Sequence, residues 1–467
     1  MSGDSYWTIG EAAAQLRRGK LSPVELAQSA LARIEKLNPR LNAFITVTVE
    51  RALRDAKAAE REIRRRKYRG PLHGIPITLK DNIWTSGIRT TAGSKILEDF
   101  IPRGDAEVAR RLWSAGAILL GKTNLHEFAY GITTDNPHYG PARNPWDTEC
   151  IPGGSSGGSA VAVATGMGFG SVGTDTGGSI RIPAALCGIV GLKPTFGRVS
   201  CGGIVPLAAT LDHAGPFARS VADAAILLDV IAQNKEPSEK FLRALRTGAG
   251  AKKERAKLRL GWPREYFFNR VDEEVKSAVR KAVREFEKMG ARIEEVPLPH
   301  VEECGQPSTQ IALAEALEYH ESQGYFPTRD ADYGEDVRAR LEMGSAIRAA
   351  DYLRAQQSRE LARADFRAAF ERVDAIIAPT TPIAAPRLKQ DTVKIGGKAE
   401  PVRGALIRMN RPANFTGFPA ISIPCGFTRS GLPIGMALHG PEWGEAKLLR
   451  IALAYEQATE WHLRHPE

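Results

Sequence analysis

Cysteine is scarce in this sequence, and long apolar runs are missing. The 467 residues include five scattered cysteines: Cys150, Cys187, Cys201, Cys304 and Cys425. None of them forms a C-x-x-C pair or stands at metal-ligand spacing from a histidine. A sparse, odd set of this kind predicts reduced, buried thiols and no disulfide framework. Because no run of about 18 apolar residues occurs, the sequence also predicts no membrane span.

Signals for export and for metal binding are missing as well. The N-terminus lacks the basic and apolar regions of a secretory signal, so the cytoplasm is the expected location. The nine histidines form no H-E-x-x-H motif, since Phe128, Ala129 and Tyr130 follow His126 and Glu127. The sequence therefore predicts no metal site and argues against a zinc hydrolase.

The chain has a formal net charge of +10, and part of the excess lies in residues 61–67, REIRRRK. This stretch ends a predicted helix, where basic side chains complement the helix dipole. The aromatic residues that RNA recognition would add are not interleaved with it. We interpret the stretch as a solvated helix face and expect no nucleic-acid partner.

Alternating apolar strands and amphipathic helices predict an α/β protein, with a mixed central sheet covered by helices on both faces. Capping boxes at Thr8 and Ser22 begin the first two helices. Further helices are expected at about 48–66, 106–116 and 445–460. Strands are expected at 41–47, 75–79, 117–120, 374–378, 420–424 and 433–438.

From about 235 to 370 the composition shifts to long, charged segments that favour helices. We expect these helices to pack outside the sheet and partly cover the site. There is no internal repeat, low-complexity tract or clear linker. The sequence therefore predicts one continuous domain over 1–467, with a catalytic core at about 65–220 and a helical excursion at about 235–370.

Glycine and serine are concentrated in residues 152–183, PGGSSGGSAVAVATGMGFGSVGTDTGGSIRIP. A flexible linker would be polar throughout, whereas residues 160–164 form an apolar run typical of a buried helix of small residues. The glycines cluster around Ser155, Ser156 and Ser179. This pattern predicts tight turns that present hydroxyls beside bare N–H groups.

Two generic motifs in this stretch lack the context that each requires. Residues 153–157 match G-x-S-x-G, but no strand leads into them, as a nucleophile elbow would need. Residues 168–173 match G-x-G-x-x-G, but TDTGGS follows instead of the start of a helix. Neither an elbow nor a dinucleotide site is expected, and a glycine loop without chemistry stays open at this point.

Three segments together resemble the amidase signature family: GIPITLKDN (74–82), PGGSSGGS (152–159) and GTDTGGSIRIPAALCGIVGLKPT (173–195). They occur in the family's order, and the 24-residue separation of Ser155 and Ser179 is also the family's. The resemblance is dense over about 65–220. It implies the family's fold and an amidohydrolase.

The resemblance implies that Ser179 is the nucleophile, Ser155 a bridging serine that follows a cis peptide bond, and Lys80 the general base. A lysine at a strand end is most often a snorkelling surface residue. A buried lysine can instead be neutral near pH 7, which requires lowering its pKa by roughly three units from about 10.4. The neutral amine can then take the serine proton through the second hydroxyl.

The resemblance also implies an oxyanion hole, because backbone N–H groups can crowd an alkoxide where side chains are absent. Its members are Thr176, Gly177, Gly178 and Ser179. Asp175 and Arg181 are implied to brace this loop, and an exposed ion pair is the alternative. Ser156 is expected to support the lysine network, to cap the following helix, or both. No metal and no organic cofactor enter this mechanism.

Within the family, the alternative to a stand-alone amidase is the glutaminase-like A subunit of a tRNA-dependent amidotransferase, which residues 121–131, GKTNLHEFAYG, resemble in general terms. That subunit carries an acidic residue seven positions before the Asn of its N-L-A-G-x-P segment, to hold the substrate's α-amino group. The matching segment here begins at Asn414, and the earlier position is Ile407, between Leu406 and Arg408. Because a buried ammonium would go unpaired there, we expect a stand-alone amidase.

The substrate pocket is expected to come from residues 128–130, the helical excursion and the residues around 408–415. Phe128 and Tyr130 are candidates for its lining, with Tyr325 and Phe326 as further aromatic candidates. Buried core is the alternative for each of these aromatic residues. The expected partner is a small-molecule alkyl or aryl amide, and the same chemistry would suit esters or carbamates. Oligomeric state is not readable from the sequence, which allows a homodimer.

Overall fold

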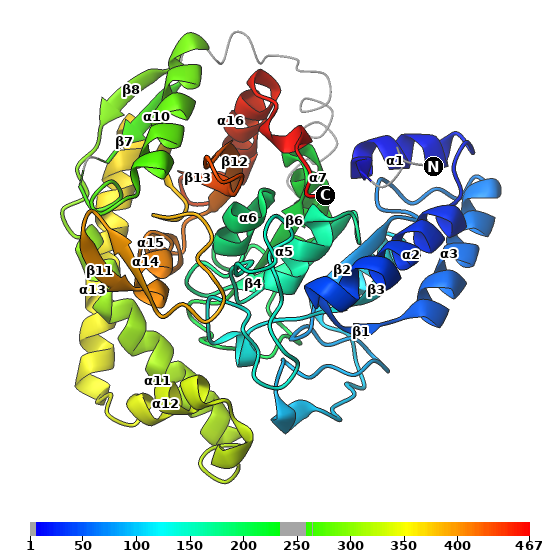
Figure 1. Ribbon diagram of the computed structural model, residues 1–467, viewed down its shortest axis with the longest axis horizontal. Coiled ribbons are helices and arrows are strands. Elements are labelled where there is room, and N and C mark those ends of the chain that lie inside the picture. Colours follow the sequence, from blue (N-terminus) through cyan, green and yellow to red (C-terminus); the bar gives the residue numbers. More distant parts are fainter. Residues whose placement is uncertain (1–5, 234–257, 264) are drawn as a thin grey trace.

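The structure is a computed structural model that describes residues 6–233, 258–263 and 265–467. A mixed sheet runs through the whole protein (Figure 1). In spatial order its 11 strands are β1 (Phe44–Val47), β3 (Ile118–Thr123), β2 (Pro76–Lys80), β4 (Gly170–Asp175), β6 (His213–Ala218), β5 (Val190–Lys193), β12 (Ala420–Phe427), β13 (Pro433–His439), β9 (Ala375–Pro379), β7 (Arg259–Trp262) and β8 (Arg292–Glu295). Strand β2 runs parallel to β3 and β4, and β7 runs parallel to β8 and β9, whereas the other neighbours are antiparallel.

The remaining elements cover this sheet or extend from it. A separate hairpin consists of β10 (Thr392–Ile395) and β11 (Lys398–Pro401). The α-helices are α1 (Ile9–Arg17), α2 (Pro23–Leu41), α3 (Val49–Arg64), α4 (Glu107–Ser114), α5 (Gly157–Ala164), α6 (Arg181–Cys187), α7 (Val221–Ile231), α10 (Glu273–Lys288), α11 (Gln306–Ser322), α12 (Glu335–Gly344), α13 (Ala349–Arg372), α14 (Val402–Arg408), α15 (Arg411–Thr416) and α16 (Glu445–Ala458). Single 3₁₀ turns lie at Lys95–Leu97, Glu127–Ala129, Val301–Cys304, Asp330–Asp332 and Trp461–Leu463.

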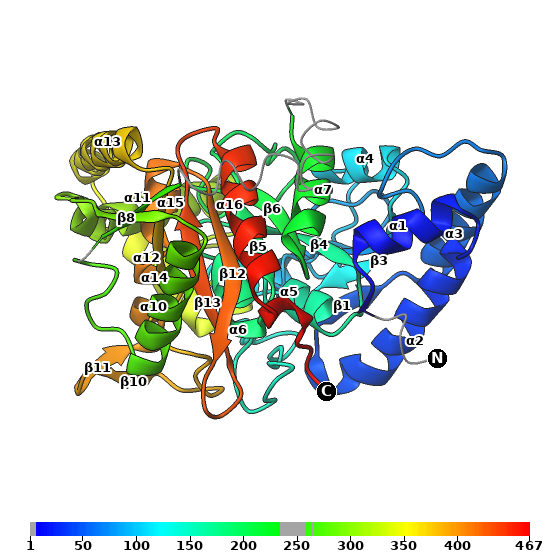
Figure 2. The ribbon, with the colours of Figure 1, turned by 90° about the horizontal axis from the view of Figure 1, so that it is seen from above.

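The sheet has a hydrophobic core on each face. In β3, Leu119 packs into one core, whereas Ile118 and Leu120 pack into the other, as the alternation of side chains along a strand requires. Figure 2 shows α4 and α7 on one side of the sheet and α5 and α6 on the other. The predicted fold class, a mixed sheet with helices on both faces, is therefore confirmed.

Local sequence signals explain where several helices begin and which face they bury. Both predicted capping boxes form, at Thr8 with Glu11 and at Ser22 with Glu25. Helix α10 buries a stripe at helical spacing: Val275, Ala278, Val279, Ala282, Val283 and Phe286. Helix α5 is fully buried and consists only of Gly, Ser, Ala and Val, as its apolar run predicts.

The region predicted as a helical excursion is only partly helical. Helices α10 to α13 lie within it, but β7 and β8 also extend the sheet, which the prediction missed. Both strands have four residues, and edge strand β8 is half exposed and charged, so neither has a clear period-two apolar pattern. Residues 235–257 of the predicted excursion lie outside the described residues. The single domain stays a prediction, which is supported by one sheet that joins strands from residue 44 to residue 439.

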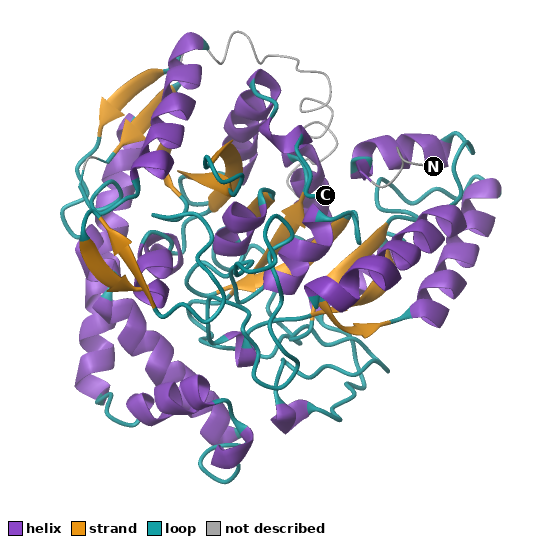
Figure 3. Cartoon of the chain, in the orientation of Figure 1, coloured by secondary structure: helices purple, strands orange, loops and turns teal. Residues whose placement is uncertain are grey.

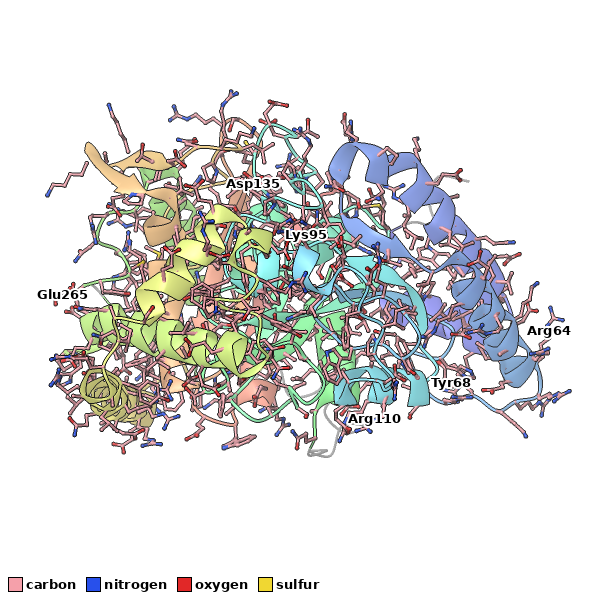
Figure 4. All side chains as sticks on the ribbon, turned by 90° about the horizontal axis from the view of Figure 1, so that it is seen from below. Arg64, Tyr68, Lys95, Arg110, Asp135 and Glu265 are labelled. Atoms are coloured by element: carbon pink, nitrogen blue, oxygen red, sulfur yellow. The ribbon has the colours of Figure 1, made fainter. Side chains whose placement is uncertain are left out.

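The basic stretch at residues 61–67 ends α3 and faces solvent. Arg64 is exposed at the periphery of the molecule (Figure 4) and pairs with Glu60 at 3.2 Å, one helical turn earlier. These contacts fit the interpretation of a solvated helix face. Within the described ranges, no helix has the length and apolar character needed to cross a membrane.

Candidate active site

Lys80 is the last residue of β2, which lies between β3 and β4 in the sheet, and it is fully buried. Strand β2 runs parallel to β4 with Leu79 opposite Val172, so both strands end at the same edge. Loops gather beyond the strand ends in this part of the molecule (Figure 3). The Lys80 Nζ donates hydrogen bonds of 2.7 Å to Ser155 Oγ and of 2.7 Å to Thr174 Oγ1. Sequence reasoning did not identify Thr174, because an inward threonine near a strand end carries no distinctive signal.

Burial lowers the pKa of Lys80 to about 7, although the negative charges of Asp212 and Asp175 act in the opposite direction. Near pH 7 a large fraction of the amine is therefore unprotonated and able to accept a proton. Its hydrogen bond to Ser155 Oγ provides a direct route for a proton between the amine and a serine hydroxyl. This environment is the one that a general base of this kind requires.

Ser155 lies in a turn that closely approaches neighbouring backbone. The peptide bond between Gly154 and Ser155 is cis, as the resemblance implies. A Cβ at Gly154 would lie 2.8 Å from the backbone nitrogen of Thr134, so only glycine fits there. The Ser156 N–H donates to the Ser179 carbonyl at 3.3 Å, which joins the two serine turns. Within the described residues no hydrogen bond joins the hydroxyls of Ser155 and Ser179, and catalytic hydrogen bonds of this kind often form only when a substrate binds.

Ser156 does not cap the following helix, but it supports the lysine network indirectly, through Thr174. It precedes α5 but makes no side-chain cap, and it has no hydrogen bond to Lys80 among the described residues. Its hydroxyl instead donates to the Thr174 carbonyl at 3.1 Å and accepts from the Thr174 N–H at 3.4 Å. Ser156 therefore fixes the end of β4, whose Thr174 side chain contacts the lysine.

The predicted oxyanion loop is present, but one of its amides is already used. The Gly178 N–H donates to Asp175 Oδ1 at 2.7 Å, so it is not available to a substrate in this arrangement. The N–H groups of Gly177 and Ser179 make no backbone or side-chain hydrogen bond within the described chain. Gly178 has φ +128°, and a Cβ there would lie 2.7 Å from the Asn410 side chain, which explains the glycine. Gly178 is therefore removed from the predicted set of oxyanion-hole donors, Thr176, Gly177, Gly178 and Ser179.

Asp175 and Arg181 form a fully buried ion pair, and the alternative of an exposed pair is wrong. The Arg181 Nε donates to Asp175 Oδ2 at 3.1 Å and its Nη2 to Oδ1 at 3.1 Å. Asn414 completes the group, because its amide donates to Asp175 Oδ1 at 2.9 Å and accepts from Arg181 at 2.6 Å. The charge of Arg181 keeps the pKa of Asp175 below its ordinary value, against the effect of burial.

Replacing Asp175 with alanine is expected to lower the free energy of unfolding by about 3–5 kcal/mol, because the buried Arg181 charge would lose its partner. Chemical denaturation of both proteins at pH 7 measures this difference. Glu273→Gln is the matched control, since it removes an exposed charge that pairs with Lys276. An Asp175→Ala protein as stable as the control would contradict a bracing role.

A cavity of about 280 Å³ opens beside the loop and is lined by Thr176, Gly177 and Ser179. Tyr130 also lines it, as expected. Helices α11 and α12 contribute further lining residues, in agreement with the expectation that the excursion partly covers the site. Three arginines, Arg340, Arg403 and Arg411, also line the cavity. Arg340 lies in the helical excursion and Arg411 in the stretch around 408–415, both of which were expected to contribute to the pocket, whereas Arg403 was not expected there.

Phe128 does not line this cavity. Its ring lies 4.4 Å from that of His320 and 5.8 Å from that of Tyr333, in a buried aromatic cluster. Tyr325 and Phe326 pack against the same cluster. Phe128 is therefore buried core, and Tyr325 and Phe326 are partly buried against it. None of the three lines the cavity, and their assignment to the pocket is corrected. Within the described chain, no three His, Cys, Asp or Glu side chains are grouped to hold a metal ion.

Comparison with known proteins gives similarity over almost the whole chain. A family model described as Amidase matches residues 25–449. The A subunit of the glutamyl-tRNA(Gln) amidotransferase of Chromohalobacter salexigens is 42% identical, over 98% of this chain and 98% of its own. A chain of a solved structure, described as a vestigial protein complex that reveals the evolutionary origins of an s-triazine catabolic enzyme, is 35% identical, with a TM-score of 0.88 over 97% of this chain and 98% of its own. The peptide amidase of Stenotrophomonas maltophilia is 32% identical, with a TM-score of 0.82 over 99% and 98% of the two chains.

Proposed function

This chain belongs to the amidase signature family, enzymes that act on amide C–N bonds, and we propose that it hydrolyses a carboxylic amide through an acyl-enzyme on Ser179. The observation that carries this proposal is the buried amine of Lys80, 2.7 Å from Ser155 Oγ and with a pKa of about 7. Few other roles would explain a buried lysine with a pKa of about 7 beside two serine turns and a cavity.

In the proposed cycle, Ser179 Oγ attacks the amide carbonyl carbon while its proton passes through Ser155 to Lys80. The developing oxyanion accepts hydrogen bonds from the backbone N–H groups of Gly177 and Ser179. The proton then returns from Lys80 through Ser155 to the leaving nitrogen, and the C–N bond breaks. Water hydrolyses the resulting ester by the same route and releases a carboxylic acid.

The second candidate is the glutaminase-like A subunit of a tRNA-dependent amidotransferase. The names of the curated relatives favour it, since several at 41–42% identity over nearly the full chain are A subunits of glutamyl-tRNA(Gln) amidotransferases. These names give no support to the expectation that the chain has no nucleic-acid partner. Against this candidate, Ile407 lines the cavity where that subunit carries an acidic residue, and its side chain cannot pair with the ammonium group of glutamine.

A panel of primary amides, p-nitroanilides, esters and carbamates, with glutamine included, tests both candidates. We expect the purified chain alone to hydrolyse at least one amide, to be indifferent to a chelator, and to act poorly on glutamine. Strong glutamine hydrolysis, or co-purification with tRNA-binding subunits, would favour the amidotransferase. A chain that forms no acyl-enzyme with any activated ester would contradict the proposed mechanism.

A further inference from the structure

The cavity beside Ser179 is strongly positive at one part of its wall. Among the described residues that line it are three arginines and no aspartate or glutamate. The rest of the lining is mainly apolar, with Leu207, Leu211 and Leu313 among its residues. A wall of this composition attracts an anionic group on a small molecule.

Two of the three arginines already have partners in the protein. The Arg340 guanidinium donates to Asp336 Oδ2 at 2.5 Å and to the Tyr130 carbonyl. Arg411 Nη1 donates to the Gly305 carbonyl at 2.8 Å. Asp336, which does not line the cavity, therefore neutralises only one of the three charges.

Arg403 has no such partner. It makes neither a hydrogen bond nor an ion pair with any residue that the structure describes, and its guanidinium lies 5.9 Å from the centre of the Tyr130 ring. Burial and the nearby charge of Arg340 lower the pKa of Arg403 to about 9. The Tyr130 hydroxyl, buried nearby, also lacks a hydrogen-bond partner. The five N–H donors of the Arg403 guanidinium and the Tyr130 hydroxyl are thus available to a ligand.

The position of Arg403 relative to the reactive loop follows from helix geometry. Arg403 and Ile407 are four residues apart on α14, so their side chains lie on one face of the helix. Ile407 contacts the loop, since a Cβ at Gly177 would lie 3.0 Å from Ile407 Cδ1. Arg403 therefore lies about one helical turn, roughly 6 Å, from the side chain that touches the oxyanion loop.

We propose that this cavity takes the half-amide of a small dicarboxylic acid, an amide whose acyl part carries a carboxylate and no ammonium group, and that Arg403 binds the carboxylate. This inference rests on the proposed hydrolase function and names its substrate class. A carboxylate accepts two parallel hydrogen bonds from one guanidinium, and the Tyr130 hydroxyl can donate another. An ammonium group would instead meet three arginines and no carboxylate in the lining.

Binding to Ser179→Ala, which removes the nucleophile and keeps the cavity, tests the inference without turnover. The probes are glutaramate, glutaramide and glutamine, which share one carbon chain and differ in charge. Calorimetry is expected to show glutaramate binding about 10- to 100-fold more tightly than neutral glutaramide or zwitterionic glutamine. Equal affinity for glutaramate and glutaramide would overturn the inference.

Arg403→Gln in the Ser179→Ala background is expected to remove about 10- to 100-fold of the affinity for glutaramate and none of that for glutaramide. Arg338→Gln is the matched control, because Arg338 is on the same helix as Arg340, pairs with Glu342 at 3.8 Å and does not line the cavity. An Arg403→Gln protein that binds glutaramate as well as the control does would also overturn the inference.

Turnover by the wild-type chain separates this inference from the proposed function. If the chain hydrolyses neutral amides or activated esters, and hydrolyses glutaramide as fast as glutaramate, the proposed function stands and the anionic subsite is wrong. If the Ser179→Ala protein prefers glutaramate through Arg403 and the wild-type chain hydrolyses no amide or ester, the subsite stands and the hydrolase proposal is wrong.

Discussion

Replacing Ser179 with alanine is expected to lower kcat for amide hydrolysis by about 10⁴- to 10⁶-fold, because the other groups of such a relay cannot act without the nucleophile. Ser179 lines the cavity and its turn is held beside Ser155 by the hydrogen bond between Ser156 and Ser179. The variant removes one oxygen from a side chain that is only slightly exposed. Initial rates on the best amide of the panel measure the effect.

The fold of this variant should be unchanged, so its denaturation midpoint provides the first control. A second control is mass spectrometry after brief exposure to an activated ester, which should label the wild-type chain at Ser179 and leave the variant unlabelled. Thr165→Ala is a matched hydroxyl deletion, since the Thr165 side chain bonds only within its own helix end and lies away from the cavity lining. Substantial activity in Ser179→Ala, with Thr165→Ala unaffected, would exclude Ser179 as the nucleophile.

Lys80→Met is expected to abolish activity to a similar degree and yet to stabilise the protein near neutral pH. In the wild-type chain, kcat/KM should rise with pH and reach half of its plateau at the pKa of Lys80, about 7, where the amine loses its proton. Lys80→Met should show a residual rate without this step. A wild-type profile that stays flat from about one pH unit below this midpoint to about two units above it would contradict Lys80 as the base.

The stability effect follows from the lowered pKa. Unfolding returns Lys80 from a pKa of about 7 to about 10.5, so the unfolded chain binds more protons between these values and stability rises with pH there. Above the unfolded pKa, burying the neutral amine of Lys80 carries no proton-linked penalty. As pH falls toward 7, this burial lowers the free energy of unfolding by on the order of 4–5 kcal/mol. Methionine removes this cost but leaves the hydroxyls of Ser155 and Thr174 without the amine, which costs about 1–3 kcal/mol.

We therefore expect Lys80→Met to unfold with a free energy about 1–4 kcal/mol higher than wild type at pH 7, and this gain should disappear toward pH 10. Lys122 is a matched control, since it is also a fully buried lysine but lies 3.3 Å from Asp81, which is buried too. Lys122→Met should destabilise the protein, because Asp81 would lose its partner. If both substitutions destabilised equally, Lys80 would be charged in the folded protein.

The sequence was sufficient to predict the fold class, and the resemblance of three segments to the amidase signature family was sufficient to propose Lys80, Ser155 and Ser179 as the catalytic residues. Taken alone, a strand that ends in Lys80 and glycines around Ser155 and Ser179 also fit a surface lysine and a glycine loop without chemistry. The order and spacing of the family's motifs single these three residues out.

What the sequence did not predict depends mostly on long-range contacts. Whether Phe128 faces the cavity or the core depends on His320 and Tyr333, which are about 200 residues away in the sequence. The use of the Gly178 amide by Asp175 is a local contact, but it depends on how the loop is turned.

The arginines of the cavity illustrate the same limit. Arg403 and Arg411 flank Ile407 at four-residue spacing, a pattern that a helix would bring to one face. This spacing alone is also typical of a solvated helix, so it does not distinguish a surface from a pocket. Only the packing of α14 and α15 against the loop shows that these side chains line the cavity.

Arg181 and its partner Asn414 are separated by 233 residues, and their hydrogen bond is fully buried. During synthesis on the ribosome, the chain emerges from its N-terminus at about 5–20 residues per second. All three residues of the proposed relay are therefore made long before the segment that secures their loop. We expect a nascent chain to remain inert toward cellular amides until translation is nearly finished, so that hydrolytic competence coincides with release of the completed polypeptide.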